Sequence, residues 1–254
     1  MKGAIPPLGN SGRGRLAIHA PIPRRGSRVT VPRHYSGGFR LPRHRHLGAY
    51  AAVVLAGEFV EAGDRGRYRL TGGKVVFHSA FEAHRDDFGR TGAVVLDLPL
   101  TRCPPLTTGV LDAMDAVVRL ARLDVRAAAA LLLENVRPSE GELADWPDEL
   151  ARALADEPHL CLATWAEQCG LSPQTVSRGF RRAYGTSPKR FRAEHRTQRA
   201  LRVLPRWTGT LGGLAAEVGF ADQAHMTRAV LSLTGWTPGQ LRAKWIQDGS
   251  RASG

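Results

Sequence analysis

The sequence predicts an α+β chain of several domains, in which a small antiparallel β-barrel is followed by helices and by an all-α C-terminal domain. Three observations support this fold class. Short apolar runs separated by glycine fill residues 35–100, a spacing typical of small antiparallel barrels. After Pro104-Pro105, apolar residues recur every three or four positions, as they do in amphipathic helices. The C-terminal third contains an internal repeat.

The formal net charge of +13 is distributed unevenly over three parts of the chain. Residues 1–57 hold ten basic and no acidic residues, and residues 58–157 hold twelve basic and eighteen acidic residues. Residues 158–254 hold fourteen basic and five acidic residues. A basic C-terminal part is expected of a protein that binds the phosphate backbone of nucleic acid, although arginine-rich genomes produce the same bias.

Composition excludes several classes of protein. The sequence has no run of eighteen apolar residues and no apolar N-terminal stretch, so neither a membrane span nor a signal peptide is predicted. Cys103, Cys161 and Cys169 form no CxxC pair and are interpreted as packing thiols in a reducing compartment. We therefore expect a cytoplasmic protein without a membrane partner.

The N-terminal third is expected to contain a basic arm and the barrel. Residues 1–34 are rich in Gly, Pro, Arg and Ser, and a disordered arm is predicted there. Residues 35–103 are expected to form the barrel. Its predicted strands are the apolar runs Tyr50–Leu55, Phe59–Glu61, Tyr68–Leu70, Lys74–Phe77 and Ala93–Leu98.

Residues 104–145 are expected to form a helical linker. Apolar periodicity predicts helices over about 108–122 and 125–136, before a polar stretch from Arg137 to Pro147. The Ala- and Leu-rich face of this helix pair is equally consistent with packing inside the chain and with a dimer interface.

Residues 146–247 contain the repeat. The segment 166–171 matches 215–220 at an offset of 49 positions, and the segment 185–188 matches 235–238 at an offset of 50. Each copy predicts a short helix, a glycine-containing turn, a second helix and a Gly-x-Ser/Thr-Pro stop, which is helix-turn-helix architecture. An Arg-rich helix over about 188–204 is predicted to hold the two copies at a fixed separation.

The second helix of the first copy has the pattern of a recognition helix. Ser172 and Pro173 are suited to begin it, and Val176, Phe180 and Ala183 form one apolar face. A polar opposite face fits a major groove, where Arg reads guanine and Gln reads adenine. A single helix of this kind is more commonly an ordinary surface helix, but its repetition favours DNA binding. The predicted DNA-contacting residues are Gln174, Ser177, Arg178, Arg181 and Arg182 in the first copy, and Gln223, His225, Thr227 and Arg228 in the second.

These motifs resemble the AraC/XylS family of transcription regulators over about residues 146–247. The resemblance is carried by Ser177-Arg178-x-Phe180, by Gly185-x-Ser187-Pro188, and by Gly219-Phe220-x-Asp222-Gln223 through Gly235-x-Thr237-Pro238. It implies two DNA-binding units in each chain and favours dimerisation. One departure is Val230-Leu231-Ser232, where the family usually has Phe followed by Lys or Arg. A weaker hold on phosphate by the second unit is therefore expected.

The barrel region resembles the cupin pattern through His44-x-His46-x-x-x-Tyr50 and His84. Regulators of this family commonly carry such a barrel as an effector-sensing domain. The resemblance therefore implies that His44, His46, Tyr50 and His84 line an effector pocket.

No metal or other cofactor is expected in the barrel, because metal-binding cupins have a Glu ligand in the slot that Tyr50 fills here. A three-histidine metal site is the alternative. His78 and Glu82 are the replacement donors nearest in sequence, but the residues between them are typical of a turn and would break a shared inward face.

We expect a non-enzymatic, sequence-specific DNA-binding transcription regulator without catalytic residues, controlled by a small-molecule effector. Two alternatives remain open: a metal-dependent cupin enzyme joined to a DNA-binding module, and a constitutive DNA-binding protein without a ligand. The expected partners are double-stranded DNA and the effector, with a second copy of the chain and RNA polymerase as further candidates.

Overall fold

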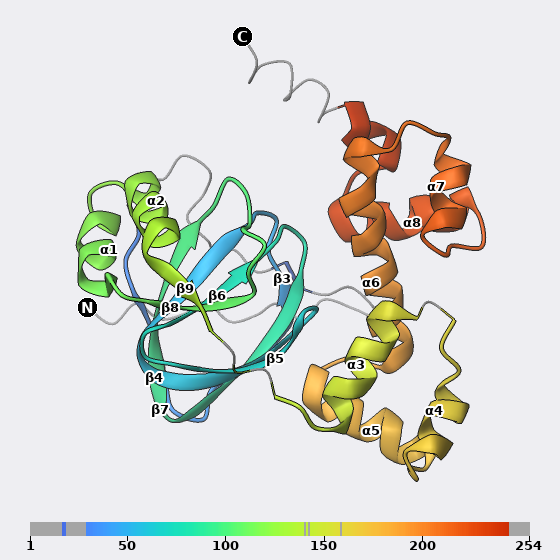
Figure 1. The fold of residues 1–254 in the computed structure, drawn as a ribbon, viewed down its shortest axis with the longest axis horizontal. Coiled ribbons are helices and arrows are strands. Elements are labelled where there is room, and N and C mark those ends of the chain that lie inside the picture. The colour runs from blue at the N-terminus through green and yellow to red at the C-terminus, as the bar shows by residue number, and fades with distance from the viewer. Residues whose placement is uncertain (1–16, 19–28, 140, 142, 158, 244–254) are drawn as a thin grey trace.

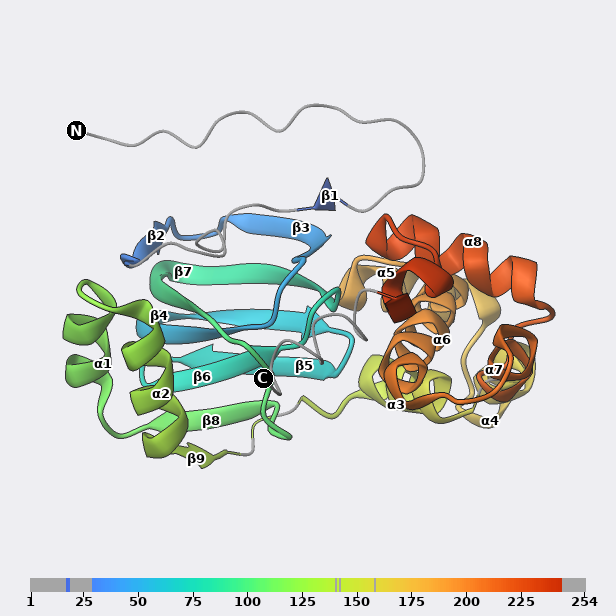
Figure 2. The same ribbon diagram turned by 90° about the horizontal axis from the view of Figure 1, so that it is seen from above.

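The computed structural model describes residues 17–18, 29–139, 141, 143–157 and 159–243. The polypeptide forms two lobes, a strand-rich N-terminal lobe (residues 29–139) and a helical C-terminal lobe (residues 146–243), as Figures 1 and 2 show. The strands are β1 (Ala17–Ile18), β2 (Arg33–Tyr35), β3 (Arg40–Arg45), β4 (Tyr50–Gly63), β5 (Gly66–Thr71), β6 (Lys74–His78), β7 (Ala83–Pro99), β8 (Thr108–Leu111) and β9 (Val136–Pro138). The helices are α1 (Met114–Ala121), α2 (Val125–Asn135), α3 (Trp146–Asp156), α4 (Leu162–Gln168), α5 (Pro173–Tyr184), α6 (Pro188–Val203), the 3-10 turn η1 (Leu204–Arg206), α7 (Leu211–Glu217) and α8 (Gln223–Thr234).

The sheet is built around the long strands β4 and β7, and the strand pairings among the described residues are antiparallel apart from that of β1 with β3. The first half of β4 lies between β6 and β7, whereas its second half lies between β5 and β7. Both long strands therefore belong to two layers, and the sheet folds over an interior. The predicted antiparallel β fold followed by helices is confirmed.

The prediction of separate strands at Tyr50–Leu55 and Phe59–Glu61 is wrong, because both segments belong to β4. The pairing with β7 shifts register on either side of Gly57. Gly57 has φ +74°, and a Cβ atom there would lie 2.0 Å from the carbonyl oxygen of Gly92. This glycine therefore permits a bend and a close strand approach within one strand, instead of a turn between two.

The two faces of β4 are both buried, in different cores. Tyr50, Ala52 and Val54 point into the sheet interior, whereas Ala51 and Val53 pack on the outside beneath α1 and α2. This alternation follows from the two-residue period of a strand. The apolar face of the helix pair thus packs inside the chain, at the end of the N-terminal lobe away from the helical lobe (Figure 2).

The segment expected to be a helical linker extends the sheet. A helix beginning near residue 108 was a wrong prediction, because Thr108–Leu111 is β8 and pairs with the edge of β6. Val136–Pro138, at the start of the expected polar stretch, is β9 and pairs with β8. At the other end, residues 1–16 and 19–28 of the predicted arm lie outside the described residues, and Arg33 and His34 belong to β2.

The C-terminal lobe contains the two predicted helix-turn-helix units, α4–α5 and α7–α8, joined by α6 (Figure 1). The first unit and α3 share a core that includes Phe180 and Phe191, and the second unit has a core that includes Met226 and Val230. Among the described residues, no helix is both long and apolar enough to span a membrane.

Candidate nucleic-acid interface and buried polar cluster

Local sequence determines both ends of α5, as expected. The Ser172 hydroxyl accepts a hydrogen bond from the backbone N–H of Thr175 at 3.1 Å, and Pro173 is the first helical residue. Gly185 ends the helix with φ +68°. The helix buries Val176 and Phe180, and its opposite side is open to solvent. All five predicted DNA-contacting residues lie on exposed positions of it: Gln174, Ser177, Arg178, Arg181 and Arg182.

Helix α8 repeats this construction with different residues. The Asp222 carboxylate accepts a hydrogen bond from the backbone N–H of His225 at 2.6 Å, and Gly235 ends the helix with φ +79°. Among the predicted residues Gln223, His225 and Arg228 are exposed and Thr227 is half-buried. Leu231, which occupies the position expected to be basic, is 45% exposed.

Helix α6 sets the separation of the two units, and it packs against α3 at one end and α8 at the other. Its side chains are shared between the cores of both units, with Phe191 in the first and Leu201 in the second. The two helix-turn-helix units are therefore held together by one continuous helix.

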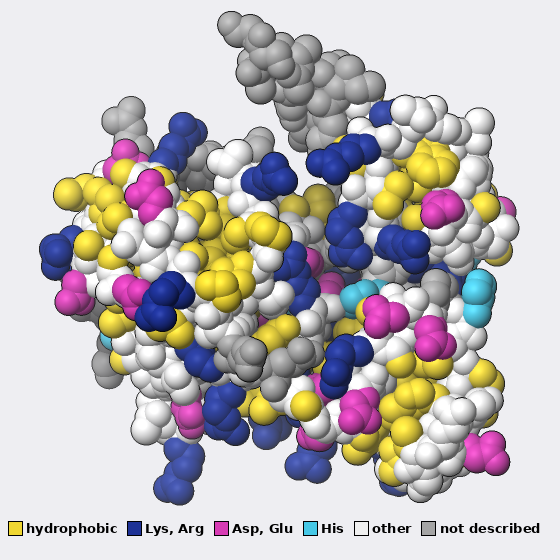
Figure 3. All heavy atoms as spheres, viewed as in Figure 1, with side chains coloured by type: hydrophobic (Ala, Val, Ile, Leu, Met, Phe, Trp, Pro, Cys, Tyr) yellow, Lys and Arg dark blue, Asp and Glu magenta, His cyan; other side chains and the backbone are white. Residues whose placement is uncertain are grey.

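The two lobes meet through buried ion pairs. Arg43 on β3 contacts Asp64, which lies between β4 and β5, and donates to Glu194 on α6 at 3.0 Å. Arg67 on β5 donates to Asp148 of α3 at 3.0 Å. Figure 3 shows Lys and Arg side chains gathered along this boundary, with acidic side chains among them.

Backbone and apolar contacts complete this boundary. Arg85 on β7 donates to the carbonyl oxygen of Arg182 at 2.7 Å, which reaches the last turn of the first recognition helix. Ala62 packs in the core of the first unit, and Phe81 packs against that of the second.

The four predicted effector-pocket residues do lie together, inside the N-terminal lobe. His44 Nε2 is 3.1 Å from His46 Nε2, and the Tyr50 hydroxyl is 2.9 Å from His84 Nε2. All four residues are buried, with exposed fractions of 2–7%. The side chains face one another, so the space between them is largely filled by the side chains themselves.

Three more residues belong to this group. The sequence analysis did not single out Glu61 and Asp86, and it considered His78 only as a replacement donor. Glu61 Oε2 lies 3.2 Å from His78 Nε2, and Asp86 Oδ1 lies 3.0 Å from His84 Nδ1. Asp86 follows His84 by two positions, so strand alternation could have placed it on the same face. Glu82, considered as a donor, instead binds Arg65 at 3.0 Å. We call His44, His46, Tyr50, Glu61, His78, His84 and Asp86 the buried polar cluster.

The buried polar cluster favours positive charge at the His84 imidazole. Burial opposes ionisation of Glu61, yet attraction to His78 and His84 holds the pKa of its carboxyl well below the usual range. Burial opposes protonation of His84, yet the carboxylates of Asp86 and Glu61 raise its pKa to about 10. Burial raises the pKa of Asp86.

Two groups within the cluster have donor atoms close enough to hold a metal ion. One is His44, His46 and His84, and the other is Glu61, His78 and His84. The first group offers three imidazoles, which suffice for zinc in some enzymes. The second offers two imidazoles and one carboxylate, a donor set that is also known for zinc. The residues therefore fit a metal, and His84 is common to both groups.

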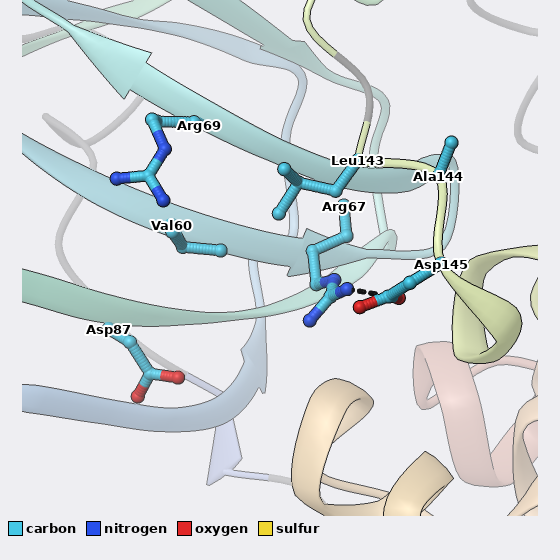
Figure 4. A pocket seen from close by; sticks show the side chains of 7 residues that line it. All are labelled: Val60, Arg67, Arg69, Asp87, Leu143, Ala144 and Asp145. Carbon is cyan, nitrogen blue, oxygen red and sulfur yellow. Dashed lines mark hydrogen bonds and ion pairs between the residues drawn. The ribbon is translucent and has the colours of Figure 1, made fainter.

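A separate pocket opens at the surface of the N-terminal lobe, with a volume of about 570 Å³. Figure 4 shows its lining, which is Val60, Arg67, Arg69, Asp87, Leu143, Ala144 and Asp145. Its wall includes the segment that leads into α3, and Arg67 also pairs with Asp145 there. The pocket therefore adjoins the connection between the lobes.

One known protein family matches part of the C-terminal lobe. The family described as a helix-turn-helix domain matches residues 165–244. The arabinose operon regulatory protein of Salmonella typhimurium is 28% identical over 128 residues, which are 50% of this chain and 45% of that protein. The virulence regulon transcriptional activator VirF of Yersinia enterocolitica is 28% identical over 126 residues, 48% of this chain and 45% of that protein. The chain thus aligns with about half the length of these relatives.

Among solved structures, ToxT from Vibrio cholerae bound to an unsaturated fatty acid aligns over 86% of this chain and 95% of its own, with 9% identity and a TM-score of 0.39. The DNA-binding domain of AdpA in complex with target DNA aligns over 41% of this chain and 96% of its own, with 23% identity and a TM-score of 0.38. These likenesses are too low to carry a functional argument. The family model thus matches the part of the C-terminal lobe that contains the two helix-turn-helix units.

Proposed function

We propose that the chain is a sequence-specific DNA-binding transcription regulator. The observation that carries this proposal is the pair of helix-turn-helix units whose recognition helices expose the polar side chains, joined by α6. Recognition helices of such units enter successive major grooves about one turn, roughly 34 Å, apart. Gln174 and Arg178 are the proposed base-reading residues of α5, and Gln223 and Arg228 those of α8.

The test is selection of bound sequences from random or genomic DNA by the full chain, followed by affinity measurements over a range of salt concentrations. We expect an enriched site with two half-sites and a steep fall of affinity with salt. A matched control variant is Arg122→Ala, because Arg122 is exposed in the N-terminal lobe, away from α5 and α8. Absence of any enriched sequence, together with no binding at low salt, would exclude this function.

We further propose that the N-terminal lobe controls the presentation of the DNA-binding units. Strand β3 and the residue that follows it, His46, support this idea because successive side chains there contact two different parts of the molecule. Arg43 and Arg45 pair with Glu194 of α6, whereas His44 and His46 belong to the buried polar cluster. A change in the cluster would shift β3 and with it the ion pairs to α6.

A small-molecule effector is part of this proposal. The predicted site at His44, His46, Tyr50 and His84 is largely filled by side chains, whereas the surface pocket has the size of a metabolite site. A ligand there would contact Arg67, which also holds Asp145 and Asp148 of the connection to α3. A thermal-shift screen with small anions tests this, since a ligand of the native state raises the unfolding temperature. A hit whose shift is unchanged by Arg69→Ala would exclude this pocket.

A further inference from the structure

We propose that Glu61, His78 and His84 bind one divalent transition-metal ion inside the N-terminal lobe. The three residues come from β4, β6 and β7, and their ligand atoms all lie within 4.8 Å of one another. This proposal differs from the expectation drawn from Tyr50, because Glu61 supplies the carboxylate from another strand. It does not depend on DNA binding by the C-terminal lobe.

The distances fit shared coordination. Glu61 Oε2 is 3.2 Å from His78 Nε2 and 3.4 Å from His84 Nδ1. Two donors bound to one tetrahedral zinc ion at about 2.0–2.2 Å stand about 3.3–3.6 Å apart. At His84 the ion would replace the hydrogen bond between Nδ1 and Asp86 Oδ1, which are 3.0 Å apart.

Charge gives a second argument. Glu61 and Asp86 are direct partners across β4 and β7, and they are 3% and 5% exposed. Like charges at directly opposite positions destabilise a sheet, and burial increases their cost. A divalent cation bound to Glu61 beside Asp86 compensates both charges.

Tyr50 then acquires a positioning role. When the ion occupies Nδ1 of His84, the ring proton lies on Nε2, where the Tyr50 oxygen 2.9 Å away accepts it. Hydrogen bonds of this kind orient a ligating imidazole and select its tautomer. Tyr50 therefore supports the ion through His84.

The space beside Glu61 and His78 is too small for an organic ligand. A pocket of about 10 Å³ lies beside Glu61 and His78, and His84 is not among the residues that line it. That volume is close to what a single water molecule requires, and metabolite sites are at least tens of times larger. Imidazole and carboxylate donors together suit zinc and neighbouring divalent metals.

The experiment uses the full chain without an affinity tag, after dialysis against a chelator. Zn²⁺ is titrated in competition with a chromophoric chelator, and Co²⁺ absorption reports nitrogen and oxygen ligation. We expect one ion per chain. Glu61→Gln and His78→Gln should each weaken binding by about tenfold or more. His34→Gln, which changes an exposed histidine on β2, should bind about as tightly as the unmodified chain.

Two results would overturn the proposal. One is an unmodified chain that takes up neither Zn²⁺ nor Co²⁺. The other is binding that is lost in His44→Gln but retained in His78→Gln, which would move the ion to His44, His46 and His84. Circular dichroism verifies the fold of each variant. If Glu61→Gln does not fold, His78→Gln decides, because it removes a ligand at the end of β6 and leaves Glu61 in place.

Discussion

Replacing Arg43 by Met should measurably loosen the contact between the two lobes. The Arg43 side chain is 2% exposed and contacts Asp64 and Glu194, which are 5% and 10% exposed. Removing one partner of a buried ion pair commonly costs about 3–5 kcal/mol, because the remaining charge stays buried without compensation. Met keeps much of the aliphatic volume, so the loss reflects charge more than packing.

The lower end of this range is expected. Glu194 keeps Arg190, whose Nε is 2.9 Å away, and Asp64 keeps the backbone N–H of Ala83 at 2.9 Å. We therefore expect a loss of about 3 kcal/mol. Urea unfolding followed by tryptophan fluorescence suits the measurement, because all five tryptophans lie at or after Trp146 and report on the C-terminal part.

Arg40→Met is the matched control, since Arg40 is also on β3 but its side chain is 78% exposed and 3.6 Å from Asp87. Exposed pairs contribute about 0–1 kcal/mol. In a double-mutant cycle, Arg43→Met should cost less in a Glu194→Gln background. Equal stability of the Arg43→Met and Arg40→Met variants would refute the argument that buried charge holds the lobes together.

Three further predictions concern the C-terminal lobe. Arg178→Ala should cost about 1–3 kcal/mol of DNA binding and relax sequence preference, whereas Arg182→Ala should weaken all sequences alike; equal losses on specific and random duplexes for both variants would contradict this division. Leu231→Arg should strengthen binding and steepen its salt dependence by about one unit of slope, because the exposed Leu231 stands where a phosphate contact is expected; an unchanged slope in a salt titration would count against that placement. Phe180→Ala should cost about 3–5 kcal/mol of stability, since Phe180 is fully buried in the first unit; calorimetry showing an unchanged unfolding temperature would exclude its role in the core.

The C-terminal lobe was predictable from sequence because its determinants are local. Ser172, Asp222, Gly185 and Gly235 begin or end helices through contacts within a few residues. The apolar period of each recognition helix selects its buried face, and the exposed face follows from it. The repeat presents the same helix-end residues and apolar period twice. The helix-turn-helix architecture could therefore be predicted without knowing any contact between distant residues.

The N-terminal lobe and its cluster depended on tertiary structure. Whether Gly57 ends a strand or bends one is decided by the approach of Gly92, which is 35 positions away. Likewise, the contacts of Glu61 with His78 and His84 form only when β4 pairs with β6 and β7, so the sequence alone does not predict them. Sequence alone identified His44 and His46, because their two-residue spacing is visible at the end of one strand. The carboxylate that complements them, and the ion pairs that join Arg43 to Glu194, come from pairings whose register is a property of the folded chain.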